Sequence, residues 1–213
     1  MLNQKHLAQL LVDIHAVSLQ PNDPFTWTSG LKSPIYCDNR LIMSYPKVRD
    51  EIEDAFVTLL REYFPAADMV AGTATAGIPH AAFIAQKLDL PMIYVRGKAK
   101  GHGKKNAIEG QLIPGQKVVM IEDLISTGGS VLHAAETVKE AGGEVLGVLA
   151  VFNYLLPASR QAFEKADYPL YTLTNFQALV EQLSETDPEI EKAKDVLEQW
   201  YQDPEKWGKR FEA

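Results

Sequence analysis

The chain has 213 residues, of which 46% are hydrophobic and 23% are charged, and its formal net charge is −7. This length allows a sizeable core in one domain with appendages, and the composition excludes a mainly disordered chain. The negative charge argues against a general nucleic-acid-binding face, so any anion site must be local. The single cysteine, Cys37, cannot form an internal disulfide, which fits a reducing, cytoplasmic setting.

Residues 1–43 are predicted to form an N-terminal helix and a small cap. Apolar side chains recur at helical spacing from Leu7 to Val17, which predicts an amphipathic helix over residues 3–19. Residues 25–37 place strand-forming residues on both sides of Ser29 and Gly30, which indicates a hairpin-like pair of short strands. We expect neither a signal peptide nor a membrane span, because no apolar run approaches the ~18 residues that a transmembrane helix needs.

Residues 44–174 are predicted to form an α/β core. Helical patterns cover residues 44–63, 77–88 and 128–141, and strand patterns cover residues 69–71, 92–95, 117–121 and 145–152. Strands made of continuous apolar runs are typical of a parallel sheet covered on both faces, so we expect a mostly parallel sheet flanked by helices. Residues 175–213 carry helix-start signals at Asn175 and Asp187, and we expect this segment to pack on the outside of the core.

Residues 118–130, which run from a strand into a helix, carry the most chemical information. Glu122 and Asp123 precede five small or hydroxylic residues: Ser126, Thr127, Gly128, Gly129 and Ser130. Backbone N–H groups at a helix N-terminus bind phosphate, and two adjacent carboxylates suit vicinal hydroxyls or a metal ion. A ribose 5-phosphate would meet both demands. The alternative is an ordinary strand-to-helix loop with a capping hydroxyl, but these residues exceed what a cap needs.

Two other loops are candidate anion sites. Residues 96–106 contain six basic residues and three glycines. Such a loop can close over a polyanionic leaving group and exclude water, and His102 can exchange a proton near neutral pH; the alternative is a solvated run of charges. Residues 72–79 also follow a strand and open a helix, and could hold a diphosphate, although a plain tight turn explains them equally well.

Together these segments resemble the type I phosphoribosyltransferases, whose diagnostic element is a hydrophobic strand, two acids and a short Thr/Gly/Ser loop, as in residues 121–130. Residues 25–30, 33–36, 38–40 and 96–102 are similar to those of the orotate phosphoribosyltransferases. The resemblance covers about residues 20 to 155. It implies a type I phosphoribosyltransferase-like fold, in which a small hood covers a mostly parallel sheet.

The resemblance also implies a reaction. Orotate and phosphoribosyl diphosphate give orotidine 5′-monophosphate and diphosphate, with Mg²⁺, in de novo pyrimidine biosynthesis. The implied dimer is a homodimer in which residues 96–109 reach the neighbouring active site. Mg²⁺ would be held mainly by substrate and water, with Asp123 as the protein group that could contribute.

Site residues follow from the resemblance position by position. The implied catalytic residues are Arg96, Lys100, His102 and Asp123. Phosphoribosyl diphosphate would contact Thr73, Ala74, Arg96, Lys100, His102, Glu122, Asp123, Leu124, Ile125, Ser126, Thr127, Gly128, Gly129 and Ser130. Orotate would contact Ser33, Tyr36, Arg40 and Ser126. The chain departs from some relatives at Thr28, where they carry a lysine, and at residues 153–156, which lack an arginine that some use near orotate.

Three alternatives stay open. A phosphoribosyltransferase for a purine or another base would have the same ribose-phosphate site, but the Ser-Gly-x-x-Ser-Pro-x-Tyr segment of residues 29–36 favours orotate. A non-catalytic regulator could sense phosphoribosyl diphosphate while binding nucleic acid; the net charge of −7 and the cationic loop oppose it. A purely structural α/β domain leaves the cationic loop and the acidic pair unexplained.

Overall fold

The computed structural model describes residues 2–27, 30–97 and 107–211. Helix α1 (Gln4–Asp13) begins at Asn3, whose side chain accepts a hydrogen bond from the His6 N–H. The predicted helix over residues 3–19 is wrong in its last part. The backbone of His15 is left-handed, with φ 58°, which ends the helix. Val17–Leu19 then forms strand β1 instead.

The next segment forms a hood of short strands and one 3-10 helix. Strands β2 (Phe25–Thr26) and β3 (Lys32–Ser33) pair antiparallel, as predicted for a hairpin, whereas β4 (Ile35–Cys37) pairs antiparallel with β1. The 3-10 helix η1 (Asn39–Ser44) follows directly. We call β1 to β4 and η1 the hood.

The central sheet contains six described strands in the order β10-β9-β8-β5-β6-β7. The strands are β5 (Met69–Thr73), β6 (Met92–Val95), β7 (Ile108–Glu109), β8 (Lys117–Ile125), β9 (Glu144–Asn153) and β10 (Leu170–Asn175). All neighbouring pairs are parallel except β6 and β7. The mostly parallel α/β fold is therefore confirmed. The middle of β8 and of β9 is fully buried, as strands covered on both faces require.

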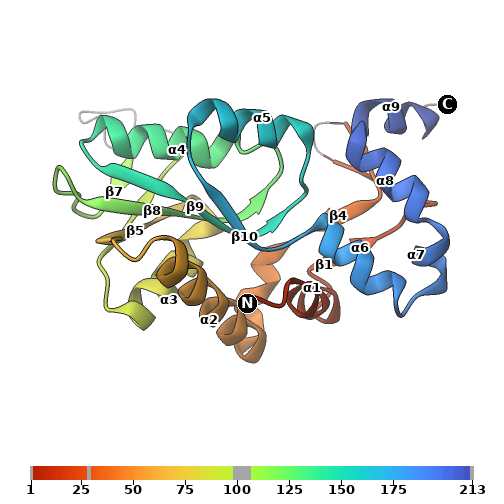
Figure 1. The fold of residues 1–213 in the computed structure, drawn as a ribbon, viewed down its shortest axis with the longest axis horizontal. Coiled ribbons are helices and arrows are strands. Elements are labelled where there is room, and N and C mark those ends of the chain that lie inside the picture. Colours follow the sequence, from red (N-terminus) through yellow and green to blue (C-terminus); the bar gives the residue numbers. More distant parts are fainter. Residues whose placement is uncertain (1, 28–29, 98–106, 212–213) are drawn as a thin grey trace.

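Helices cover both faces of this sheet (Figure 1). Helices α2 (Pro46–Tyr63) and α3 (Gly77–Leu88) lie on one face, and α4 (Gly129–Glu140) and α5 (Pro157–Ala166) lie on the other. Each layer has its own cluster of buried apolar side chains. In a parallel sheet the carboxyl ends of neighbouring strands meet at one edge, so the loops after β5 and β8 lie together.

The C-terminal segment is helical from the predicted starting points. Asn175 caps α6 (Phe176–Ser184), and Asp187 caps α7 (Pro188–Lys192). Helices α8 (Lys194–Gln202) and α9 (Pro204–Gly208) and the 3-10 helix η2 (Lys209–Phe211) complete the chain. Trp200 and Trp207 from these helices are fully buried in the same core as α1. Within the described residues, no helix has the length and apolar character to cross a membrane.

Candidate active site

A cavity of about 410 Å³ lies beyond the carboxyl end of β8. Its lining residues come from the hood, from the loop after β5 and from the segment that runs from the end of β8 to the first turn of α4: Cys37, Asp38, Arg40, Ala74, Thr75, Ala76 and every residue from Glu122 to Val131. This last segment therefore forms most of the wall. Ligands of open α/β sheets bind at this kind of edge.

Residues 126–130, the predicted phosphate-binding loop, lie at the start of α4. Gly128 precedes the helix with φ +82°, a left-handed conformation that suits glycine. A Cβ atom built on Gly128 would lie 2.6 Å from Cε2 of Phe163 in α5, so a larger residue would also meet a buried ring. The first backbone N–H groups of α4 and the helix dipole then face the cavity, and both favour a dianionic phosphate.

Glu122 and Asp123 lie beside this loop at the end of β8. The Glu122 side chain is only 6% exposed, and its Oε1 accepts a hydrogen bond of 3.0 Å from the Asp123 N–H. Burial, followed by the neighbouring Asp123, raises the pKa of Glu122 to about 9. This shift favours the protonated form of the carboxyl, which can donate as well as accept a hydrogen bond.

The hood supplies the opposite wall of the cavity. Arg40 binds Asp38 in two places, Nε to Oδ1 at 2.6 Å and Nη2 to Oδ2 at 2.8 Å, and this pairing lowers the pKa of Asp38. Asn39 points inward and is 1% exposed. Its Nδ2 donates to the backbone oxygen of Asp123 at 2.7 Å, and its Oδ1 accepts from the Cys37 thiol at 3.3 Å. Asn39 thus fixes the hood to the acidic pair.

A second cavity of about 320 Å³ lies on the other side of the phosphate-binding loop. Its lining residues are Thr73, Ala74, Val95, Arg96, Gly97, Gly129, Ser130, His133 and Ala134, of which Ala74, Gly129 and Ser130 also line the first cavity. The Thr73 hydroxyl is buried and has no hydrogen-bond partner among the described residues. Nε of Arg96 lies 3.2 Å from Oε1 of Glu109. Helix α3, which follows the loop after β5, must begin with a glycine, because a Cβ on Gly77 would meet the backbone oxygen of Ile121 in β8.

These two cavities bring together most of the predicted site residues. The residues so gathered are Arg40, Thr73, Ala74, Arg96 and the run from Glu122 to Ser130. Ser33 and Tyr36 are not among the described lining residues: the Ser33 hydroxyl donates to the Ile35 carbonyl at 2.9 Å, and Tyr36 is 46% exposed. Lys100 and His102 lie outside the described residues. Sequence reasoning missed Asn39, whose only signal is its place between Asp38 and Arg40.

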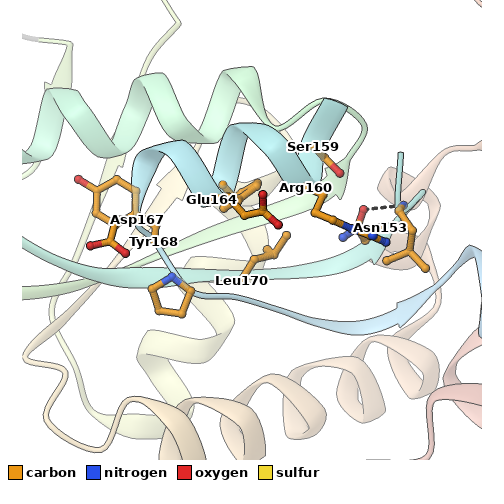
Figure 2. A pocket seen from close by; sticks show the side chains of 10 residues that line it. Asn153, Ser159, Arg160, Glu164, Asp167, Tyr168 and Leu170 are labelled. Carbon is orange, nitrogen blue, oxygen red and sulfur yellow. Dashed lines mark hydrogen bonds between the residues drawn. The ribbon is translucent and has the colours of Figure 1, made fainter. Parts of the chain in front are cut away.

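A larger cavity, of about 470 Å³, lies elsewhere, between α5 and the strands β9 and β10 (Figure 2). None of the predicted site residues that the structure describes lines it. Arg160 on its wall donates to the Tyr201 hydroxyl at 3.2 Å, and the Asn153 side chain accepts from the Leu155 N–H at 2.8 Å. Phe163 lines this cavity and also packs against Gly128, so the larger cavity borders the back of the phosphate-binding loop.

The chain matches the phosphoribosyl transferase domain family over residues 42–203. It is 55% identical to the orotate phosphoribosyltransferase of Enterococcus faecalis over 96% of this chain and 98% of that protein. It is 56% identical to that of Bacillus caldolyticus over 96% of this chain and 99% of that protein. The solved orotate phosphoribosyltransferase of Aeropyrum pernix superposes with a TM-score of 0.75, at 26% identity, over 84% of this chain and 98% of that one. By its cavity and by these near full-length matches, the chain belongs to the phosphoribosyltransferase family and, within it, to the orotate phosphoribosyltransferases.

Proposed function

We propose that the cavity beyond β8 transfers the 5-phosphoribosyl group of phosphoribosyl diphosphate to orotate. The products are orotidine 5′-monophosphate and diphosphate, and the step belongs to pyrimidine biosynthesis. One observation carries the proposal: a helix N-terminus built for phosphate and two adjacent carboxyl groups line a single cavity. Phosphate at one end and vicinal hydroxyls at the other are the two features of a ribose 5-phosphate.

The ribose half of the substrate fits the residues from Glu122 to Ser130. The 5-phosphate would accept hydrogen bonds from the N–H and hydroxyl groups of residues 126–130. The 2′ and 3′ hydroxyls would donate to Asp123 and exchange hydrogen bonds with Glu122, whose proton allows donation as well as acceptance. The Asn39 side chain holds the Asp123 backbone, so the carboxyl pair keeps its place relative to the hood.

The diphosphate half fits the second cavity. Thr73 offers a buried hydroxyl without a described partner, and Arg96 offers a positive charge at the base of the cationic loop. Lys100 and His102 belong to the same proposal as groups that stabilise the departing diphosphate. The two cavities share Ala74, Gly129 and Ser130, so one extended ligand can occupy both.

We expect Mg²⁺ to bind together with the substrate rather than at a site made only of protein side chains. Among the described residues no three His, Cys, Asp or Glu side chains come together as a metal site, so most ligands would come from the diphosphate and water, with Asp123 as a contributor. When bound, the ion would neutralise charge on the diphosphate oxygens.

The residues of the two cavities would have different roles in the reaction. Breaking the bond between C1′ and the diphosphate oxygen builds positive charge on the ribose and negative charge on the leaving group. Asp123 lies on the ribose side and Arg96 on the diphosphate side, so each faces the opposite charge. The orotate ring nitrogen would attack from the face opposite the diphosphate, with Arg40 and Ser126 beside it and Ser33 and Tyr36 supporting the hood. No covalent nucleophile is needed.

The proposal includes a homodimer in which residues 96–109 reach the neighbouring active site. Four large apolar side chains within residues 36–45, in and next to the hood, are between 36% and 46% exposed: Tyr36, Leu41, Met43 and Tyr45. Exposed large apolar side chains that gather on a surface are typical of protein interfaces. The cytoplasm is the proposed location, since the lone Cys37 fits a reducing compartment.

Mixing two inactive variants tests the dimer. Lys100→Ala removes the loop cation, and Asp123→Asn removes an acid of the cavity. If the loop acts on the neighbouring subunit, random reassociation restores activity at about a quarter of all sites, because half of the dimers are mixed and each has one complete site. A loop that acts within its own subunit would restore none.

The reaction itself is tested by the fall in orotate absorbance on mixing with phosphoribosyl diphosphate and Mg²⁺, with adenine, hypoxanthine and uracil in parallel. Consumption of orotate alone supports the proposal. Consumption of a purine would overturn the choice of base. Binding of phosphoribosyl diphosphate without consumption of any base would instead favour a regulator. Asp123→Asn is the matched inactive control.

A further inference from the structure

Four aromatic side chains join the hood to the C-terminal helices. The Trp27 ring lies 4.9 Å from Tyr154 and 6.0 Å from Trp200, measured between centroids, and Phe176 lies 5.0 Å from Trp200. Trp27 belongs to the hood, Tyr154 follows β9, and Trp200 belongs to α8. Such ring pairs add to the stability gained from burial alone. The cluster therefore ties three parts of the chain that are far apart in sequence.

The two indole N–H groups of this cluster both donate to the hood backbone. Nε1 of Trp200 donates to the Lys32 carbonyl at 3.3 Å, and Nε1 of Trp27 donates to the Ile35 carbonyl at 3.2 Å. Trp200 is 0% exposed, so water cannot replace its bond to Lys32. The C-terminal helices thereby hold β3, and Trp27 holds the start of β4.

Strand β3 continues through the single residue Pro34 into β4, which leads directly into the active-site cavity. Strand β4 ends at Cys37, which lines the cavity together with Asp38 and Arg40. Between these residues Asn39 donates to the Asp123 carbonyl. The position of β4 thus sets the position of the hood wall.

We propose that Trp200 is a positioning residue for the active site, through which the C-terminal helices fix the hood wall on the orotate side. This inference rests on the proposed function, since it assigns the hood wall to the base. The phosphate-binding loop is built on β8 and α4 and has its own supports in Phe163 and Gly77. Trp200 therefore acts on the binding of orotate more than on the binding of phosphoribosyl diphosphate.

Trp207 provides a matched control. It is 1% exposed in α9 and belongs to the same core, but its Nε1 has no hydrogen-bond partner among the described residues. A Trp→Phe change keeps an aromatic ring and deletes one N–H at either position. Only Trp200→Phe deletes a bond to the hood.

The test measures KM for both substrates and kcat in Trp200→Phe and Trp207→Phe. A neutral hydrogen bond contributes enough to change an equilibrium constant about fivefold. We expect Trp200→Phe to raise KM for orotate about fivefold, with KM for phosphoribosyl diphosphate changed less than about twofold and kcat nearly retained. Trp207→Phe should leave both KM values unchanged. Equal effects of the two variants, or an equal rise in both KM values, would overturn the proposal.

A second variant keeps the test decisive if Trp200→Phe does not fold. Trp27→Phe deletes the bond to Ile35 from the hood side and should raise KM for orotate selectively as well. An unchanged KM for orotate in Trp27→Phe would overturn the proposal. When both single variants fold, the double variant should be non-additive, because both act through the same hood strands. Absence of orotate turnover in the wild-type protein would mark failure of the proposed function, which is separate from a failure of Trp200 to act on KM.

Discussion

Replacing Gly128 with alanine tests whether the left-handed turn before α4 shapes the phosphate site. Gly128 has φ +82°, and a Cβ there would lie 2.6 Å from Cε2 and 3.2 Å from Cδ2 of Phe163. The left-handed conformation costs an alanine ~1–2 kcal/mol. The Phe163 ring can yield toward the 470 Å³ cavity that it lines, at a further cost of ~1 kcal/mol for a strained rotamer. The expected total is ~2–3 kcal/mol.

The protein can accommodate the added Cβ in two ways, and two measurements together detect both. If the loop keeps its shape, the free energy of unfolding falls by the full amount. If the loop gives way, the phosphate site is distorted, and KM for phosphoribosyl diphosphate rises by up to roughly 30-fold to 150-fold. Urea unfolding and initial rates are therefore measured on the same preparation. Gly129→Ala is the comparison for adding a Cβ to the same loop without strain, because a Cβ there meets only the Thr127 hydroxyl at 3.8 Å; since Gly129 also lines both cavities, only the excess effect of Gly128→Ala counts.

The two parts of the cost can also be separated. In a Phe163→Leu background the ring is gone, so Gly128→Ala should lose only the backbone part, ~1–2 kcal/mol. If Gly128→Ala changed neither the free energy of unfolding nor KM beyond the effect of Gly129→Ala, the assigned role of this turn would be wrong.

Three further outcomes are expected. Burial raises the pKa of Glu122 from 4.5 to about 9, so between these pH values the folded protein holds a proton that the unfolded chain releases. Because of this carboxyl, the free energy of unfolding is highest below pH 4.5 and falls as pH rises toward about 9. Glu122→Gln should flatten that decline in urea unfolding across the same pH range, and a decline as steep as in the wild type would contradict the assignment. Asn39→Asp should raise KM for phosphoribosyl diphosphate about tenfold, since it loses the donor to the Asp123 carbonyl and adds charge there; Asn39→Ala, which loses this donor and the acceptor for the Cys37 thiol but adds no charge, should do less, and equal effects would exclude a role for the added charge. Lys100→Ala should lower kcat more than it weakens ribose-phosphate binding, as its charge is needed when diphosphate departs; equal losses in both would refute that role.

The sequence predicted the parts of the fold whose signals are local. Strands β8 and β9 are continuous apolar runs, and Asn175 and Asp187 cap helices as their positions suggested. The sequence analysis did not predict α5 or β10. Helix α5 buries only Ser159 and Phe163, and β10 is an edge strand of the described sheet that buries only Leu173 and Thr174, so neither has a strong apolar pattern. Strand β1 was mistaken for helix because the helical spacing continues past the left-handed turn at His15.

Long-range contacts explain what sequence reasoning could not reach in the site. Asn39 and Asp123 are 84 positions apart, and Trp200 and Lys32 are 168 apart, so no spacing rule connects either pair. The acidic pair and the phosphate-binding loop were predictable because a single strand-loop-helix segment carries them. The hood wall depends on how three segments pack, and packing is a property of the folded chain.

The aromatic cluster also bears on how a negatively charged base can be held. Tyr154 lies in the segment where some relatives carry an arginine, and here its ring is 3% exposed and packed against Trp27. A tyrosine hydroxyl carries no positive charge, and burial raises its pKa here and so disfavours the anion, so Tyr154 does not supply the charge that an arginine would. Among the described residues that line the first cavity, Arg40 is the only basic side chain, and Asp38 already neutralises much of its charge. In the proposed complex, neutral N–H and hydroxyl donors held in fixed positions would then share recognition of the orotate carboxylate with Arg40. A site of this kind is sensitive to small displacements of its wall, which is the physical reason why a buried tryptophan in α8 should affect KM for orotate.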